Sequence, residues 1–163
     1  MKKNLLFIIL FFCLSCNSQQ PKNTVDFKIK KSELEWKNEL SKVSFYVLRM
    51  QGTEPPFSGK YNNNYQEGVY ICAGCKTPLY ESRFKYNSKS GWPSFDRGIN
   101  ENILVDVDYK LGYPRTELKC LSCGGHLGHL FNDGPEKTTG QRHCINSAAL
   151  IFLKKNEKEK ISN

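Results

Sequence analysis

Two closely spaced pairs of cysteines constrain the fold of this 163-residue chain more than any other feature. Cys72 and Cys75 form the segment CAGC, and Cys120 and Cys123 form CLSC. Each pair lies beside a glycine at the edge of a run of β-prone residues. Two CxxC turns offer four thiolates, each able to lie about 2.3 Å from one ion, which is the ligand set of a structural zinc site. The fold must therefore bring together two turns that residues 76–119 separate.

The first residues are typical of an export signal. Two lysines precede an apolar run that is short for a transmembrane helix, and the small residue Ser15 precedes Cys16. The segment resembles the lipobox of bacterial lipoproteins, although Cys13 stands where that pattern favours leucine. We expect a signal peptide over residues 1–16, with Cys16 lipidated and the protein exported to the periplasmic side of a membrane. A plain signal peptide that releases a soluble periplasmic protein, or an uncleaved apolar anchor, is the alternative.

The rest of the chain is expected to form a tether, one domain and a tail. Residues 17–30 are polar and aperiodic, as in a tether. Residues 31–153 form the domain, and 39% hydrophobic residues in the whole chain suffice for one core. Residues 154–163 mix both charges, as in a flexible tail. The formal net charge of +8 is scattered rather than gathered in a basic stripe, so no nucleic-acid partner is expected.

Short helices followed by strands are expected within the domain. Ser32 and Glu35 have the spacing of a capping box. Apolar residues then recur at roughly helical intervals, at Leu34, Trp36, Leu40, Val43 and Val47. Farther along, Gly, Pro and Asn clusters separate five β-prone runs: GVYICAG, ILVDVDY, RTELKC, HLGHLF and AALIFL. The pattern predicts a mainly antiparallel β domain behind a small helical entry.

The chemistry of the two CxxC pairs has three possible readings. Zinc is favoured. Export to an oxidising compartment would also allow two disulfides. A catalytic CxxC is the weakest reading, because neither pair has the βαβ setting of a thioredoxin-like motif.

A further cysteine, Cys144, has no cysteine neighbour in its segment RHCINSAAL. It is either a buried structural cysteine or a reactive thiol. If the segment is extended, Arg142 shares its face and favours the thiolate, whereas His143 points to the opposite face. The local sequence leaves both alternatives open.

Over about residues 40–153 the chain resembles the type B methionine sulfoxide reductases, because six segments occur in that family's order. They are GTEPPFSGKY, CAGC, GWPSF, RTELKC with CLSC, HLGHLFNDGP, and RHCINSAAL. The resemblance implies two small antiparallel β sheets with short helices outside, and a zinc ion held by four cysteines. It also implies an enzyme that reduces the R epimer of methionine sulfoxide in proteins.

The resemblance further implies catalytic roles. Cys144 matches the nucleophile, which attacks the sulfoxide sulfur and ends as a sulfenic acid. His126 and His129 match the proton donors to the sulfoxide oxygen. Asn146 would order the site, and Arg142 would stabilise the thiolate. Because four thiolates complete a zinc shell, both histidines stay free for chemistry.

Substrate binding and regeneration follow from the same family pattern. Trp92 of GWPSF matches an apolar wall for the substrate methyl group, with Phe131 as a further member. Many members carry a resolving cysteine directly before this segment, and here Ser90 occupies that position. An external thiol, such as a thioredoxin-like or glutathione-type reductant, would then regenerate Cys144. We expect a monomer that acts on oxidised proteins and meets the membrane through its lipid anchor.

Two rival functions use some of the same residues. A zinc-ribbon module would stack nucleic-acid bases on Trp92 and Phe95, although export and the scattered charge speak against it. A general thiol–disulfide oxidoreductase would depend on Cys75 rather than on Cys144.

Overall fold

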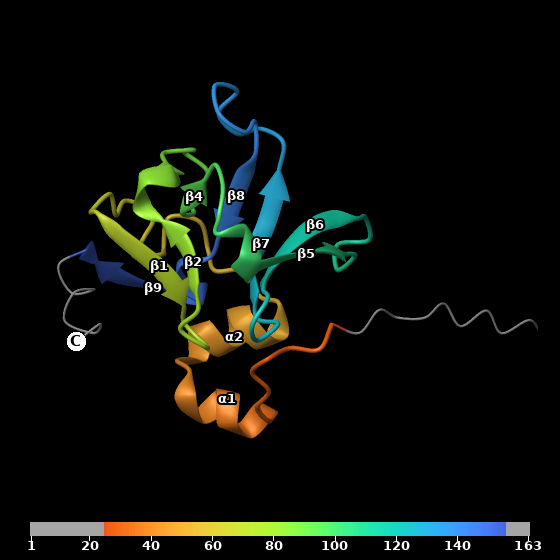
Figure 1. Ribbon diagram of the computed structural model, residues 1–163. Helices are drawn as coiled ribbons and strands as arrows, with labels where there is room; N and C mark the ends of the chain where they lie inside the picture. The colour runs from red at the N-terminus through yellow and green to blue at the C-terminus, as the bar shows by residue number, and fades with distance from the viewer. Residues whose placement is uncertain (1–24, 156–163) are drawn as a thin grey trace, which may run out of the picture.

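Two short helices and two antiparallel sheets make up residues 25–155, the part of the chain that the computed structural model describes (Figure 1). The expected signal peptide with Cys16, the tether as far as residue 24 and the tail from residue 156 lie outside these residues. Among the described helices, none combines the length and apolar character needed to cross a membrane. Ile29, near the end of the expected tether, donates its N–H to the carbonyl of Ser122 at 2.8 Å. This part of the chain therefore contacts the second CxxC turn.

The helices α1 (Glu33–Glu39) and α2 (Lys42–Met50) follow each other directly and lie together at one end of the sheets (Figure 1). The expected capping box is confirmed. The Oγ of Ser32 accepts the Glu35 N–H at 3.3 Å, and the Glu35 carboxylate accepts the Ser32 N–H at 2.7 Å. Ser41 then caps α2 and restarts the helical phase.

The apolar stripe expected along this helical segment is only partly correct. Trp36 and Val47 are buried, whereas Leu34 and Val43 are 67% and 52% exposed. The break at Leu40 and the new N-cap reset the helical phase, so one continuous stripe cannot extend across both helices.

A three-stranded sheet has the order β2–β1–β9, and all of its pairings are antiparallel. Its strands are β1 (Gly68–Cys72), β2 (Pro78–Glu81) and β9 (Leu150–Lys154). In the central strand, Tyr70 pairs with Tyr80 on one side and with Phe152 on the other. The sheet therefore joins a hairpin from the middle of the chain to a strand close to its C-terminal end.

A six-stranded antiparallel sheet has the order β3–β4–β8–β7–β6–β5. Its strands are β3 (Lys85–Tyr86), β4 (Ser94–Phe95), β5 (Ile103–Asp108), β6 (Arg115–Cys120), β7 (His126–Phe131) and β8 (Arg142–Ile145). One row of paired residues runs through Ser94, Cys144, His129, Glu117 and Asp106. Because directly paired residues share a face, this row places polar side chains side by side. Three single 3₁₀ turns complete the described chain: η1 (Ser82–Phe84), η2 (Asn100–Asn102) and η3 (Ser147–Ala149).

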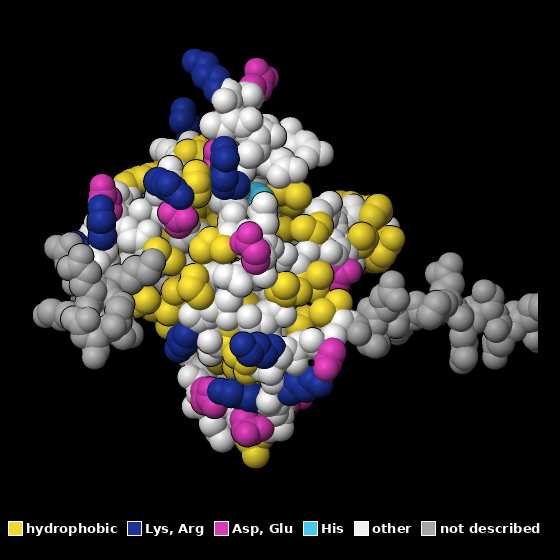
Figure 2. Space-filling model, viewed as in Figure 1, with side chains coloured by type: hydrophobic (Ala, Val, Ile, Leu, Met, Phe, Trp, Pro, Cys, Tyr) yellow, Lys and Arg dark blue, Asp and Glu magenta, His cyan; other side chains and the backbone are white. Residues whose placement is uncertain are grey.

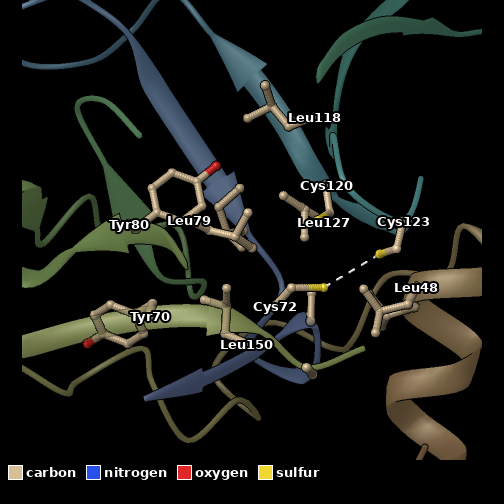
Figure 3. Packing of buried hydrophobic residues seen from close by; sticks show 14 of the residues in the cluster. Leu48, Tyr70, Cys72, Leu79, Tyr80, Leu118, Cys120, Cys123, Leu127 and Leu150 are labelled. Atoms are coloured by element: carbon tan, nitrogen blue, oxygen red, sulfur yellow. Dashed lines mark hydrogen bonds between the residues drawn. The ribbon is translucent and has the colours of Figure 1, made fainter. Parts of the chain in front are cut away.

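The hydrophobic core lies where the two sheets and α2 meet (Figure 3). The rings of Tyr80 and Phe95 stack with their centroids 4.4 Å apart, and Tyr70 meets Phe95 edge-on at 5.2 Å. Leu48 of α2 and Leu118 of β6 close the same cluster. The core thus fixes the inner face of the six-stranded sheet and leaves its polar row on the other face.

The expected fold class, mainly β with two small antiparallel sheets, is confirmed, and each of the five β-prone runs overlaps a strand. Strands β2, β3, β4 and β8 were not predicted from the runs. Two of them contain only two residues each, and β8 carries Arg142 and His143 instead of a recognisable apolar alternation. Their extended conformation comes from pairing with longer neighbours, which a local pattern does not report.

Candidate active site

Cys144 lies on β8 between two other strands, where its paired neighbours are Ser94 of β4 and His129 of β7. The extended conformation considered for this segment is confirmed. Arg142 shares the face of Cys144, whereas His143 points to the other face and is buried in the core with 7% of its surface exposed. The strand therefore delivers one thiol to the polar row.

A small cavity of about 140 Å³ opens beside the Cys144 side chain. The cavity is lined by Thr53, Trp92, Arg115, Gly128, His129, Phe131, Cys144 and Asn146. Five of these were predicted from the sequence, and two other predicted residues, Arg142 and His126, lie next to the cavity lining rather than in it. The cavity combines a thiol, an imidazole and an amide with two aromatic rings, so it suits a small group that has one polar and one apolar end.

Burial raises the pKa of the Cys144 thiol, although the charge of Arg142 and a hydrogen bond with Ser90 act in the opposite direction. Arg142 lowers the pKa as expected, but it also donates from Nε and Nη2 to the two carboxylate oxygens of Asp133, at 2.8 Å each. Its guanidinium lies 4.3 Å from the centroid of the Phe131 ring. At neutral pH the thiol is therefore the resting form, and the site needs a base to generate the nucleophile.

His129 is held by a buried carboxylate. Its Nε2 lies 2.9 Å from Oδ2 of Asp108. Burial favours the neutral acid, but the hydrogen bonds from the Lys110 N–H, His129 and Arg115 outweigh it and hold the pKa of Asp108 at about 2. Because an ionised Asp108 only accepts hydrogen bonds, Nε2 carries the proton and Nδ1 of the neutral ring is free. Burial lowers the pKa of His129, so this ring is a base directly across from Cys144.

His126 lies deeper in the same cluster, with 2% of its surface exposed. Its Nδ1 is 2.6 Å from Oε1 of Glu117, and its ring centroid is 5.2 Å from that of His129. Burial acts to raise the pKa of Glu117, but His126 and Lys119 outweigh it, so the pKa is lowered and the carboxylate is ionised. The Nε2 of His126 has no hydrogen-bond partner among the described residues. This nitrogen is available to a water molecule or a substrate.

A buried carboxylate ties together three parts of the site. Glu54 accepts the N–H of Ser147 at 2.5 Å and the N–H of Ala148 at 2.9 Å. Its own N–H donates to Oδ1 of Asn146 at 3.0 Å, and its carbonyl accepts Nε1–H of Trp92 at 3.0 Å. Glu54 therefore fixes the apolar wall and the amide of the cavity relative to the strand that carries the thiol.

Ser90 lies beside the thiol, with its Oγ 3.9 Å from the Sγ of Cys144. Ser88 bridges this residue to the strand, because its Oγ is 2.8 Å from that of Ser90 and 2.6 Å from that of Ser94. A chain of three hydroxyls therefore ends at Cys144, and its last member is Ser90, which the sequence analysis noted as the residue in place of a resolving cysteine.

Sequence reasoning missed several residues of this site, among them four charged ones: Glu54, Asp108, Arg115 and Glu117. Three of them lie on β5 and β6, where charged residues occur at alternate positions of otherwise β-prone runs. That two-residue period is a usable signal, since it marks a strand face that is not packed on a core. Glu54 has no comparable signal, because its role depends on backbone groups almost a hundred residues away.

The four cysteines of the CxxC pairs meet at the junction of the two sheets. Figure 3 shows Cys72, Cys120 and Cys123 of this cluster. The four sulfurs all lie within 4.8 Å of one another, with Cys72 to Cys123 at 3.9 Å and Cys75 to Cys120 at 3.4 Å. A tetrahedral ion with metal–sulfur bonds of about 2.3 Å needs sulfurs about 3.8 Å apart, so the donor set fits. All five described cysteines are free, and these two sulfur–sulfur separations are much longer than a disulfide bond of about 2.05 Å.

Comparisons with known proteins agree with this geometry. Residues 40–154 match the family model described as the SelR domain. A protein of Bradyrhizobium diazoefficiens named peptide methionine sulfoxide reductase MsrB is 48% identical over 78% of this chain and 91% of its own length. Proteins of the same name from Leptospira interrogans and Methylibium petroleiphilum are 45% and 47% identical. They align with 80% and 77% of this chain and with 99% and 91% of their own lengths.

Proposed function

This chain belongs to the SelR domain family, and on that premise we propose that it reduces methionine-R-sulfoxide in proteins to methionine, with Cys144 as the nucleophile. The observation that carries the proposal is the pairing of Cys144 with His129 across β7 and β8, inside a cavity that has both polar and aromatic walls. The names of the relatives support peptide methionine sulfoxide as the substrate.

The proton moves between Cys144 and His129, which are neighbours in the polar row. The Cys144 thiol has a raised pKa, and its paired neighbour His129 is neutral with no proton on Nδ1, so His129 accepts the thiol proton. The thiolate then attacks the sulfoxide sulfur, and the oxygen gains negative charge as the new sulfur–sulfur interaction forms. His129 returns the proton to this oxygen, while Asp108 stabilises the charged ring between the two transfers. His126 becomes a second donor only when its ring is protonated, because ionised Glu117 keeps the proton of the neutral ring on Nδ1 and leaves Nε2, which has no partner among the described residues, as an acceptor.

The products balance without another reactant. The transient sulfur–sulfur bond breaks as the protonated oxygen moves from the methionine sulfur to the Cys144 sulfur, so methionine is released and Cys144 becomes a sulfenic acid. One external thiol then forms a mixed disulfide with Cys144 and releases water. A second thiol attacks that disulfide, which restores Cys144 and gives the oxidised reductant. Ser90 contributes a hydroxyl rather than a thiol, so both thiols come from outside the described domain.

The aromatic walls account for the choice of epimer. Trp92 is fixed through its Nε1–H to the carbonyl of Glu54, and it lines the cavity together with Phe131. A sulfoxide carries a methyl group and an oxygen on the same sulfur. When the methyl packs on the rings and the oxygen faces the imidazole, only one handedness leaves the sulfur open to Cys144.

Zinc is the ion that we propose for the four-cysteine cluster. Four thiolates are the typical ligand set of structural zinc, and the bound ion would hold the two CxxC turns together. The cluster lies at the sheet junction and contributes no side chain to the cavity lining. Its role is therefore to support the fold rather than to act on the sulfoxide.

The decisive experiment measures turnover of separated R and S epimers of methionine sulfoxide, both free and within a peptide. The wild-type protein should reduce only the R epimer with dithiothreitol as reductant, and Cys144→Ser should abolish the reaction. Glu67→Gln, which changes an exposed carboxylate paired with Lys155, serves as the control and should retain full activity. Reduction of the S epimer alone, or full activity of Cys144→Ser, would refute the proposal.

The need for an external reductant has its own test. Mass spectrometry of the oxidised wild-type protein should find a sulfenic acid or a mixed disulfide at Cys144. Ser90→Cys should instead form an internal disulfide with Cys144, because the two side chains already lie within 3.9 Å. An internal disulfide between Cys144 and any of the four clustered cysteines in the wild-type protein would contradict the proposed regeneration.

We also propose that the protein is exported and lipidated at Cys16, which lies outside the described residues. The support is the sequence alone: a basic start, a short apolar run and a small residue before Cys16. Membrane fractionation with mass spectrometry of the mature N-terminus tests this proposal. A soluble periplasmic protein with a free N-terminus would support the plain signal peptide, and a cytoplasmic protein with an intact start would refute export.

A further inference from the structure

Exposed hydrophobic side chains gather at the end of the β5–β6 hairpin (Figure 2). Tyr109, Leu111 and Tyr113 are 66%, 57% and 55% exposed, and all three lie in the loop between the strands. We call these three residues the hairpin platform. Soluble proteins rarely leave several large hydrophobic residues exposed together unless the surface binds something.

The hairpin platform is held in place by contacts with the end of α2 and by hydrogen bonds within the hairpin itself. The Nζ of Lys110 donates to the carbonyls of Met50 and Gln51, at 3.2 and 2.9 Å, where α2 ends. The N–H of Lys110 donates to Oδ1 of Asp108 at 2.6 Å, and the N–H of Gly112 donates to the carbonyl of Tyr109 at 2.9 Å. A loop with these contacts presents its side chains in a fixed arrangement, which lowers the entropy cost of binding a partner.

The loop that carries the hairpin platform is connected to the wall of the cavity that contains Cys144. Arg115 follows the loop directly and lines that cavity, and it is ion-paired with Asp108, the last residue before the loop. On the other side of the loop, Gln51 precedes the cavity residue Thr53 by two positions. The residues that hold the loop on either side therefore lie in the wall of the cavity, as Arg115 does, or two positions from it, as Gln51 does.

The volume of the cavity indicates what has to lie on the hairpin platform. About 140 Å³ accommodates one side chain, so the polypeptide on either side of a bound methionine sulfoxide must leave over the rim. Strand β6 is two strands away from β8, which is about 10 Å, and the loop continues beyond its end. Since an extended chain advances about 3.3 Å per residue, the hairpin platform lies roughly four residues from the sulfoxide.

We propose that the hairpin platform binds apolar side chains of the substrate polypeptide, about three to five residues from the methionine sulfoxide. This proposal rests on the proposed function and specifies its substrate class: extended segments with hydrophobic flanks, such as those that an unfolded protein exposes. The three side chains offer apolar area without a charged group of their own, so the flank is recognised by burial rather than by an ion pair.

The test compares a triple variant, Tyr109→Ser with Leu111→Ser and Tyr113→Ser, with the wild-type protein. The substrates are a peptide with leucine and phenylalanine flanks, a peptide of equal length with serine and glycine flanks, and N-acetyl-methionine-R-sulfoxide amide. The variant should lose at least tenfold in kcat/KM for the apolar peptide and less than twofold for the small amide. The double variant Leu34→Ser with Val43→Ser removes two similarly exposed apolar residues on α1 and α2, and it should lose nothing.

Each of the following outcomes would contradict the proposal, and each points to a different cause. An equal loss on the amide would mean that the loop supports the cavity itself, and no loss on either peptide would mean that the hairpin platform does not bind substrate. If the wild-type protein is a dimer and the triple variant is a monomer, the surface binds a second copy of the chain instead of substrate. An unoxidised apolar peptide should also inhibit reduction of the apolar sulfoxide peptide by the wild-type protein, and its failure to compete would refute docking. Failure of the proposed function is distinct, because the wild-type protein would then not reduce the small amide.

Discussion

Replacing Glu54 by glutamine should destabilise the domain out of proportion to the size of the change. The Glu54 side chain is buried, with 5% of the residue exposed, and its two oxygens accept the N–H groups of Ser147 and Ala148 at 2.5 and 2.9 Å. Glutamine keeps one acceptor oxygen but turns an NH₂ group toward the other N–H. One charge-assisted hydrogen bond is lost, and a buried donor is left without a partner.

The expected cost follows from these two losses. A hydrogen bond to a charged group contributes about 1.5–3 kcal/mol, and an unsatisfied buried donor costs about 1–3 kcal/mol. We therefore expect Glu54→Gln to lower the free energy of unfolding by about 3 kcal/mol, which is a large part of the roughly 5–15 kcal/mol that a domain has. Urea unfolding followed by tryptophan fluorescence measures it, because Trp36 is buried.

The same variant should also impair binding more than chemistry. The backbone of Glu54 contacts both Asn146 and Trp92, so its displacement moves the amide and the apolar wall of the cavity. We expect KM for the R epimer to rise more than kcat falls. The matched control is Glu67→Gln, whose carboxylate is exposed and should cost less than about 0.5 kcal/mol. A Glu54→Gln protein within 0.5 kcal/mol of wild type would refute this account of the buried carboxylate.

Three further predictions concern acid stability, the metal cluster and the proton path. Burial lowers the pKa of His143 to about 4, compared with about 6.5 in an unfolded chain, so stability should fall by roughly 3 kcal/mol as the pH drops from 6.5 to 4. His143→Gln should flatten this part of the urea-midpoint profile, and an unchanged slope would contradict the assignment. Removing metal with a chelator should lower the thermal midpoint, and zinc but not magnesium should restore it; an unchanged midpoint in protein shown to be metal-free would disprove a structural ion. Asp108→Asn should lower kcat and shift the acid limb of the pH profile of kcat, because His129 loses its charged partner. Asp106→Asn, on the same strand, should leave kcat and its pH profile unchanged.

The features that could be predicted from the sequence are those with a local signature. The CxxC spacing identified the four cysteines that the structure brings together, and the capping box at Ser32 located the start of the first helix. Cys144 was singled out because it has no cysteine neighbour in its segment, although the local sequence left a buried and a reactive role open. In each case the informative residues lie within a few positions of each other, so a short window contains the whole pattern.

The features that escaped prediction depend on contacts between distant segments. Asp108 reaches His129 only because β5, β6 and β7 are neighbours in the sheet, and Glu54 reaches Ser147 only because the fold brings together residues that are 93 positions apart in the chain. The exposure of Leu34 follows from the position of a helix break, which shifts the phase of the apolar pattern. The strand order and the helix packing therefore determine which charged residues meet at this site. No single segment of the sequence predicts either of them.

The pairing of β1 with β9 has a consequence for the timing of folding. Synthesis starts at the N-terminus, so β1 and β2 can form their hairpin early, but the second edge of β1 has no partner until residues 150–154 have been made. The turn η3, whose N–H groups Glu54 binds, comes directly before that last strand. Assembly of the cavity therefore waits for the end of the described domain, and until then the chain exposes an open strand edge to chaperones, to aggregation and to any machinery that moves unfolded polypeptides.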